Sequence, residues 1–286
     1  MPGDSGFAHL KDWIGRTDLR HDVVTIAPLA ALSALLDRDD AAPKNGDAAP
    51  PLAHWLYFLP VYRQSDAGPD GHALKGGFLP PVPLPRRMWA GSRLEFLRPF
   101  TVGAEVSRLS RITEVTFKEG RSGPLVFVTV RHEVSDAVGV VLSDEHDIVY
   151  RGEAPLKATE GAPRARAPEN EVWRREIRPD PVLLFRYSAV TFNSHRIHYD
   201  HPYVTQVEGY PGLVVHGPLI ATLLVDLLRR NLPRATLRRF SFRALKPLYD
   251  TGSFFTCGVA DEVNRTARLW TRDAAGEATM EATATW

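Results

Sequence analysis

The fold is decided by the most strongly patterned helix of the chain, predicted from residues 217–233, GPLIATLLVDLLRRNLP. Pro218 suits the first helical position, where its missing N–H leaves no hydrogen bond unmade, and Pro233 follows the helix end. Between them a wide apolar stripe consists of Leu219, Ile220, Leu223, Leu224, Leu227 and Leu228. Strand-like segments follow, and residues 277–286 alternate apolar and polar side chains. An apolar helix followed by antiparallel strands predicts a sheet wrapped around a buried helix.

A short motif links the two halves of the chain. Residues 97–103, LRPFTVG, resemble residues 245–252, LKPLYDTG, which are one residue longer. In each half a strand is expected before the basic-proline step, and strands are expected after the glycine. A motif this short also arises by chance, but its placement in both halves favours a duplicated unit.

The first half has no helix as strong as residues 217–233. A short helix is expected over 28–36, a polar loop over 37–51, and a stiff extended path over the proline-dense stretch 76–85. Residues 94–96, 106–117, 125–134 and 146–150 are rich in β-branched and aromatic side chains and predict strands. We therefore predict an α+β protein with an N-terminal unit over 1–151, a linker over 152–180 and a C-terminal unit over 181–286.

Composition excludes several classes of function. The apolar share of 44% and the charged share of 24% are typical of a globular protein. A net charge of +1 argues against a nucleic-acid partner. A single cysteine, Cys257, excludes an internal disulfide and a cysteine-rich metal site. No secretory signal and no apolar run of about 20 residues is visible, so a cytoplasmic location without a membrane partner is expected.

Residues 192–200, FNSHRIHYD, carry the candidate chemistry. They place a side-chain amide, two imidazoles and a guanidinium in one short segment, and His216-Gly217 stands at the start of the predicted helix. An imidazole beside an amide can hold and deprotonate a water molecule. A free N–H at a helix start can stabilise negative charge on a carbonyl oxygen. The pattern therefore favours addition of water to an activated acyl compound, or its removal.

These residues resemble the MaoC-like hotdog hydratases, which act on acyl thioesters. The pattern of that family is an Asp, an Asn two residues later, a His five residues after the Asp, and later a His-Gly pair before the central helix. Here Asn193 stands at the Asp position, His195 at the Asn position and His198 at the His position, and His216-Gly217 matches the pair.

The chain is more similar still to the branch with two hotdog units. That branch includes mesaconyl-C4-CoA (3-methylfumaryl-CoA) and itaconyl-CoA hydratases and the type 2 hydroxyacyl-thioester dehydratases. The likeness is carried by 185–188, FRYS, leading into 192–200, and by 85–91, PRRMWAG. It implies a double hotdog, with antiparallel sheets each wrapped around a central helix, in which the first unit is eroded and non-catalytic. It also implies an acyl-CoA substrate, with coenzyme A as part of that substrate and no separate cofactor or metal.

The departure from the family pattern lies at Asn193, because an amide cannot exchange protons as the family's acid does. His198 is then expected to act alone as base and, on the return step, as acid. Asn193 would orient the water, and the N–H of Gly217 would stabilise the enolate oxygen.

Further residues are candidates for substrate binding. Arg196 and Arg87 could hold a substrate carboxylate, although Arg196 could instead form an ion pair with Asp200 or Glu208. His195, Tyr199, His216 and Trp89 are the other candidates, and His195 and His216 could equally orient their neighbours. An arginine run over 229–243 could meet coenzyme A phosphates or simply form a solvated face. We assign His54, His72, His132 and His146 to structural or surface positions.

The leading hypothesis is an acyl-CoA hydratase or dehydratase, a hydro-lyase, for a short branched dicarboxylic thioester: mesaconyl-C4-CoA or itaconyl-CoA, converted to citramalyl-CoA. Alternatives are a 3-hydroxyacyl-ACP or -CoA dehydratase of fatty acid synthesis, a hotdog thioesterase, and a binding module that has lost its acid. The assembly is expected to be either a monomer or a homodimer.

Overall fold

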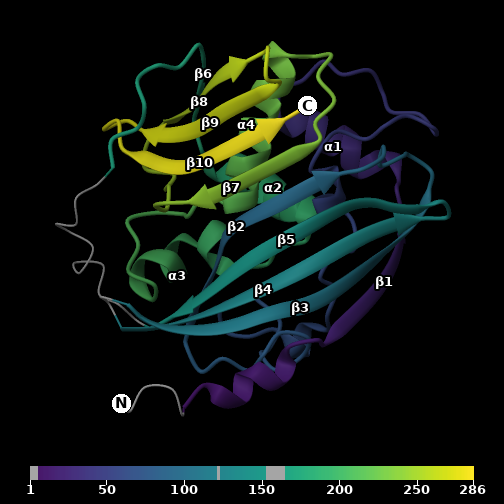
Figure 1. The fold of residues 1–286 in the computed structure, drawn as a ribbon. Helices are drawn as coiled ribbons and strands as arrows, with labels where there is room; N and C mark the ends of the chain where they lie inside the picture. The colour runs from purple at the N-terminus through teal and green to yellow at the C-terminus, as the bar shows by residue number, and fades with distance from the viewer. Residues whose placement is uncertain (1–5, 121–122, 153–164) are drawn as a thin grey trace.

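A computed structural model describes residues 6–120, 123–152 and 165–286 (Figure 1). In these residues ten strands form one antiparallel sheet in the order β1-β3-β4-β5-β2-β7-β10-β9-β8-β6. The strands are β1 (Thr17–Val23), β2 (Arg86–Phe96), β3 (Glu105–Gly120), β4 (Gly123–Asp136), β5 (Gly139–Arg151), β6 (Trp173–Ile177), β7 (Arg239–Ala244), β8 (Phe254–Asp261), β9 (Thr266–Asp273) and β10 (Ala278–Thr285). With separate helices on one face, this architecture is α+β, as predicted.

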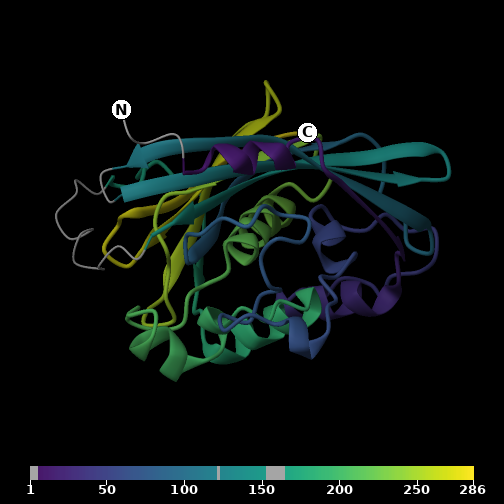
Figure 2. The ribbon, with the colours of Figure 1, turned by 90° about the horizontal axis from the view of Figure 1, so that it is seen from below.

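The helices form two layers beneath the sheet, which Figure 2 shows nearly edge-on. They are α1 (Ile26–Leu35), α2 (Pro181–Thr191), α3 (His201–Gln206) and α4 (Gly217–Asn231), with short 3-10 turns η1 (Ala8–Trp13), η2 (Ala53–Leu56), η3 (Gln64–Asp66) and η5 (Arg196–His198). Helix α4 lies directly under the sheet, whereas α1, α2 and α3 lie farther from it (Figure 2). Every residue of α4 from Leu219 to Leu228 is buried, so the sheet does wrap around this helix.

The strand order shows the duplication that the repeated motif predicts. Read outward from the β2–β7 pair, one half of the sheet runs β2-β5-β4-β3-β1 and the other runs β7-β10-β9-β8-β6. The two copies of the motif make the same backbone contacts. The N–H groups of Leu97 and Arg98 both donate to the carbonyl of Val141, and those of Leu245 and Lys246 both donate to the carbonyl of Thr279.

The first unit lacks the central helix, which is the erosion that was expected. Helices α1 and α2 each follow an edge strand, but the described residues of the first unit hold no counterpart of α4. In its place, residues 52–85 run as coil with two short 3-10 turns. Prolines prevent a helix over the end of this path, where Val82 and Leu84 instead pack into a small core against β3 and β4.

The predicted linker is partly wrong. Residues 153–164 lie outside the described residues, but Trp173–Ile177 form strand β6, which pairs with β8. Ala167 is also buried, against Cys257 and Trp270. The linker-like composition misled because an edge strand that buries only alternate side chains needs few large apolar residues.

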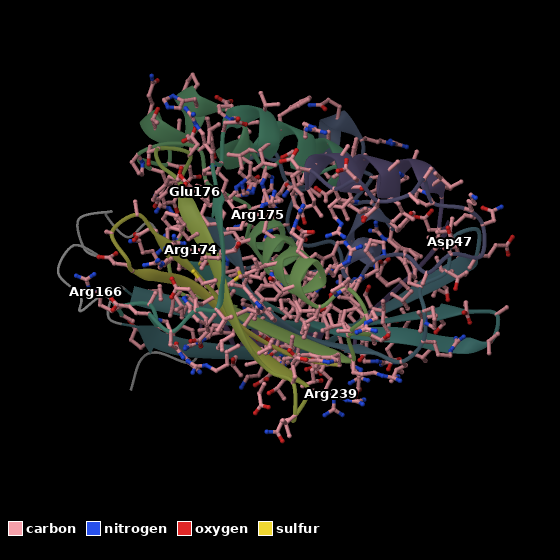
Figure 3. All side chains as sticks on the ribbon, turned by 90° about the horizontal axis from the view of Figure 1, so that it is seen from above. Asp47, Arg166, Arg174, Arg175, Glu176 and Arg239 are labelled. Carbon is pink, nitrogen blue, oxygen red and sulfur yellow. The ribbon has the colours of Figure 1, made fainter. Side chains whose placement is uncertain are left out.

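One core joins the two units. It combines side chains from α1, α2, α4 and the strands of both halves, so the β2–β7 boundary does not divide the hydrophobic interior. At the end of α4, the buried Asp226 carboxylate pairs with Arg38, Arg175 and Arg230. Figure 3 marks Arg175 beside the central helix and Arg239 on the outer side of the sheet. In the described residues no helix combines the length and apolarity that crossing a membrane requires.

Candidate active site

The motif segment is a chain of tight turns between α2 and α4. Helix α2 ends at Phe192 in the left-handed conformation, with φ of 49°, and the N–H of Asn193 donates to the carbonyl of Ser188. Residues Arg196–His198 form η5, and the N–H of Val214 then ties this turn to the approach to α4 by donating to the carbonyl of Ile197 at 2.9 Å. The turn therefore holds His198 beside the start of α4.

His198 is buried and has a fixed tautomer. Its Nδ1 lies 2.7 Å from the carbonyl oxygen of Val214, and because a carbonyl only accepts, Nδ1 must carry the proton. Nε2 is left as the acceptor and makes no hydrogen bond to the described residues. Burial lowers the pKa of His198 to about 4, against the smaller opposing effect of the Val214 bond. The imidazole is therefore neutral, and able to take a proton, at pH 7.

The ring of His216 stacks against the ring of His198. The two rings stack with centroids 3.6 Å apart, and His216 is fully buried. Its Nε2 lies 2.9 Å from the hydroxyl of Ser188, and its ring also meets the edge of Tyr187. Burial holds the pKa of His216 well below the usual range, so it is neutral and fixes the plane of the His198 ring.

Gly217 begins α4 with an N–H that no described residue accepts. Such N–H groups of a first helical turn have no partner within the helix. A Cβ added at Gly217 would meet only the carbonyl oxygen of Trp89, at 3.7 Å, so the space beside this backbone is open. The positive end of the helix dipole adds to the field of the N–H. An oxygen that gains negative charge would be stabilised here.

The side chain of Asn193 forms a hydrogen bond within its own turn. Its side-chain oxygen accepts a hydrogen bond from the backbone N–H of His195 at 3.0 Å. One lone pair of this oxygen remains for a water molecule.

A second group of side chains reaches the site from the first unit. His72 lies against His195, with ring centroids 4.0 Å apart, and His195 lies edge-on to His198 at 5.4 Å. We call His72, His195, His198 and His216 the imidazole row. Asp70 extends it, since its carboxylate oxygen is 3.0 Å from Nδ1 of His72. Asp70, His72 and His195 offer donor atoms that all lie within 4.8 Å of one another, a set that could also hold a divalent metal ion.

Comparison with known proteins places the chain in a family. The sequence model of the family described as hydroxyacyl-thioester dehydratase type 2 matches residues 52–250, well over half of the chain. The chain belongs to this family. It is 47% identical over 243 residues to the mesaconyl-C(4)-CoA hydratase of Chloroflexus aurantiacus, a match that covers 85% of this chain and 86% of the relative. The protein is therefore an enzyme of the hydratase and dehydratase type, as the motif predicted.

Solved structures confirm the double hotdog. A MaoC-like dehydratase matches with a TM-score of 0.72 at 14% identity, covering 96% of this chain and 99% of that chain. A Mycobacterium tuberculosis protein described as having a double hotdog fold matches with a TM-score of 0.58 at 13% identity, covering 95% and 96%. At these identities the likeness establishes the fold alone.

The two candidate arginines of this dehydratase-family site differ in their surroundings. Arg196 forms the ion pair with Asp200 that was the alternative to substrate binding, at 2.8 Å, and its guanidinium also covers the ring of Tyr203. Arg87 has no carboxylate within 4 Å among the described residues. Its charge acts on both His72 and His195, where it helps to lower their pKa after the larger effect of burial. Arg87 is thus a cation near the imidazole row that bonds to the hydroxyl of Tyr150 and has no carboxylate partner among the described residues.

The remaining candidates for substrate binding, Tyr199 and Trp89, form hydrogen bonds to nearby backbone carbonyls. The hydroxyl of Tyr199 donates to the carbonyl of Ser194, and 45% of the residue is exposed. The indole of Trp89 donates to the carbonyl of Gly91, and its ring packs against Trp55 and His146.

Two features lie away from the imidazole row. A cavity of about 310 Å³ opens between α1, residues 38–43 and Arg229. Arg229 is twelve residues along α4 from Gly217, about 18 Å at helical rise, so this cavity is not part of the site. The arginine run over 229–243 is held largely by acids: Arg229 by Asp40, Arg230 by Asp226, Arg239 by Glu95 and Arg243 by Glu281.

Of the four histidines assigned to structural or surface positions, three form structural hydrogen bonds and the fourth, His72, lies beside His195. His54 and His146 bond to the buried Asp144, and His132 bonds to Ser110, as structural residues do. His72 instead lies in the imidazole row. The signal available in the sequence was the segment Asp70-Gly71-His72, but no periodicity could show that a coil of the first unit reaches the turn at 194–196.

Proposed function

We propose that this enzyme adds water reversibly across the α,β double bond of a short, branched, dicarboxylic enoyl-CoA, with mesaconyl-C4-CoA as substrate and citramalyl-CoA as product. The observation that carries the proposal is that His198, with Nε2 unprotonated, lies in a turn tied to the approach to α4, where the N–H of Gly217 has no acceptor among the described residues. The similarity to a protein named as a mesaconyl-C(4)-CoA hydratase supports the choice of acyl group.

The chain's own groups supply each step. The thioester carbonyl oxygen accepts from the N–H of Gly217, which polarises the double bond. His198 Nε2 takes one proton from a water molecule as the water oxygen bonds to the β-carbon. The electron pair of the double bond moves to the thioester as an enolate, whose oxygen lies at the start of α4. His198 then returns the proton to the α-carbon, and dehydration is the reverse sequence. A second acceptor must hold the other hydrogen of the water, which is the role that the sequence assigns to Asn193.

Arg87 favours a substrate with a carboxylate close to the reacting carbon. In mesaconyl-C4-CoA the free carboxylate is attached to the β-carbon, which is the carbon that receives the water. A cation that binds it must therefore lie next to the catalytic imidazole. Arg87 is the candidate for this role because no carboxylate lies within 4 Å of it among the described residues and its charge acts on His72 and His195 of the imidazole row. A long-chain substrate of fatty acid synthesis would place only methylene groups there.

The reaction needs proton transfer and stabilisation of an oxyanion, which the residues above provide, so we propose that coenzyme A enters as part of the substrate and that no separate cofactor is required. Coenzyme A rather than an acyl carrier protein is the proposed carrier. For the assembly, both a monomer and a homodimer are proposed.

A panel of three thioesters tests the function. The protein is incubated with mesaconyl-C4-CoA, itaconyl-CoA and crotonyl-CoA, with His198→Ala as the control. Hydration removes the conjugated thioester absorbance of mesaconyl-C4-CoA, releases no free thiol and gives a product heavier by one water molecule. Release of thiol would instead identify a thioesterase, and preference for crotonyl-CoA or longer chains would identify a dehydratase of fatty acid synthesis. Binding without turnover of any thioester would contradict an enzymatic role.

A further inference from the structure

A carboxylate from the first unit reaches the imidazole row. Asp70 holds His72 in two ways, since one carboxylate oxygen accepts from the backbone N–H of His72 and the other lies 3.0 Å from its Nδ1. Burial raises the pKa of Asp70, but the bond and the charge of His72 outweigh it, so the pKa lies well below the usual range. An ionised Asp70 makes Nδ1 of His72 the protonated nitrogen. Nε2 of His72 is then an acceptor, like Nε2 of His198.

The loop that carries this pair is locked onto the motif turn. The carbonyl of Gly71 accepts from the hydroxyls of Tyr62 and Ser194, and the carbonyl of Asp70 accepts from the backbone N–H of Arg196. Gly71 has φ of +89°, and a Cβ there would lie 2.0 Å from the carbonyl oxygen of Ser194. Contacts this close on two successive residues, Asp70 and Gly71, fix where Asp70 and His72 sit relative to His195 and His198.

We propose that the pair of Asp70 and His72 takes the place of the family's missing acid, with His72 Nε2 as the second acceptor that holds the attacking water. This rests on the proposed hydration reaction. Asn193 is less suited to the role because one of the two lone pairs of its oxygen is already taken by the backbone N–H of His195. His72 suits it because a quarter of its side chain remains accessible to solvent, and its charge state acts on both His195 and His198.

The two protons of the water have separate fates in this arrangement. One hydrogen points to His198 Nε2, is taken up as the C–O bond forms, and is returned to the α-carbon. The other hydrogen points to His72 Nε2, stays on the oxygen, and remains on the hydroxyl group of the product. His72 therefore touches the reacting water without changing its own protonation, and Asp70 is a positioning residue that keeps its Nε2 free.

The same atoms could instead bind a divalent metal with His195, and this reading makes a different prediction. A metal would need all three ligands and would be removed by a chelator. The water-holding role needs a hydrogen-bond acceptor at position 72 and no ion.

The test uses Asp70→Asn, His72→Ala and His72→Gln, with His198→Gln for comparison and Asp66→Asn as a control. Asp66 is an exposed acid of the same loop. His72→Ala is expected to lower kcat about 100-fold with little change in KM, and Asp70→Asn about 10-fold. Because a glutamine oxygen can accept a hydrogen bond but cannot take up the proton, His72→Gln is expected to stay within about 10-fold of the wild type. His198→Gln is expected to fall by about 100-fold or more.

Each other outcome decides against the proposal. Full activity in His72→Ala shows that His72 does not hold the water. A His72→Gln variant as inactive as His198→Gln shows that His72 transfers a proton. Loss of activity on chelation, restored by zinc or manganese ions, shows a metal site. A wild type that leaves every thioester of the panel unchanged defeats the proposed function itself, and this inference with it.

Discussion

The protonated Nδ1 of His198 donates a hydrogen bond of 2.7 Å to the carbonyl oxygen of Val214. This bond leaves Nε2 as the nitrogen that can accept a proton. The backbone of Val214 is itself fixed, since its N–H bonds to Ile197. The base and the approach to α4 are thereby tied together, so the backbone fixes the turn that carries His198 relative to the start of α4. A hydratase needs this relationship because water adds at the β-carbon while charge develops at the carbonyl oxygen of the same substrate.

His198→Ala is expected to lower kcat by about 100- to 10,000-fold, the usual contribution of a general base. The physical reason is that no other imidazole of the row combines burial with a carbonyl that fixes its tautomer. Initial rates with the substrate that performs best in the panel measure the effect. Circular dichroism of the variant serves as the folding control, and a correctly folded variant with near-normal rates would contradict the role of His198.

The acid limb of the pH profile is expected near pH 4, and not near the 6.5 of a free histidine. Burial lowers the pKa of His198 to about 4, and only the neutral imidazole accepts a proton. kcat/KM should therefore stay level from pH 7 to about 5 and fall about tenfold per unit below 4. Short assays over pH 3.5–8 test this, and a limb centred at 6–7 would show that a different group is the base.

Stability is expected to decline in a related window. An unfolded histidine binds its proton near pH 6.5, whereas folded His198 binds it near 4, so between these values the unfolded chain holds more protons. The contribution of neutral His198 to the free energy of unfolding is therefore fully present above pH 6.5. It decreases as the pH falls toward 4, by about 3 kcal/mol in total. His54, His132 and His216 shift in the same direction through burial. Urea unfolding at pH 7.5 and 5.0 measures the change, and His198→Gln should show a smaller one.

The fold was predictable where one side-chain pattern determines one element. The stripe of 217–233 gave α4, and the two basic-proline motifs gave the two units because each begins the same turn after β2 or β7. The strand β6 escaped prediction because five residues, of which Ile177 is buried and Trp173 partly so, carry too little periodicity. The continuity of the sheet through β2 and β7 is a long-range pairing, for which no local pattern exists.

The site was predictable within the motif turn and not beyond it. The resemblance to the family pattern was sufficient to nominate His198 as a base and Gly217 as an oxyanion donor, and the structure places the turn of His198 beside the start of α4. The contribution of Asp70 and His72 depends on a coil that approaches from more than 120 positions earlier, and its position is set by hydrogen bonds to backbone carbonyls. Such bonds leave no compositional trace. The ion pair of Arg196 shows the converse, because a charged residue inside a catalytic motif can still be structural.

Arg87→Met is expected to affect dicarboxylic substrates selectively. Loss of a hydrogen-bonded charge pair costs about 1.5–3 kcal/mol, which corresponds to about a 10- to 150-fold drop in kcat/KM for mesaconyl-C4-CoA. Crotonyl-CoA has no second carboxylate and should be affected far less. Arg86→Met is the matched control, since the neighbouring arginine is paired with Glu208. Equal losses on both substrates in Arg87→Met would show that Arg87 acts on coenzyme A or on the fold.

The loop that brings Asp70 and His72 to the site can be displaced without touching either residue. Gly71 and Gly76 both have left-handed backbones, with φ of +89° and +93°. An alanine costs each of them the same conformational strain, about 1 kcal/mol. At Gly71, however, the new Cβ would lie 2.0 Å from the carbonyl oxygen of Ser194, whereas at Gly76 it would meet only Pro81, at 3.6 Å. Gly71→Ala must therefore move the loop away from the motif turn.

Gly71→Ala is accordingly expected to lower kcat by about as much as His72→Ala, about 100-fold, while Gly76→Ala keeps nearly full activity. Thermal unfolding should show a small loss of stability in Gly76→Ala and a larger one in Gly71→Ala, because the clash with the backbone of Ser194 adds to the shared strain. Assays well below the unfolding temperature of both variants separate the position of the loop from stability. Equal activity in the two alanine variants would show that catalysis does not depend on where this loop holds Asp70 and His72.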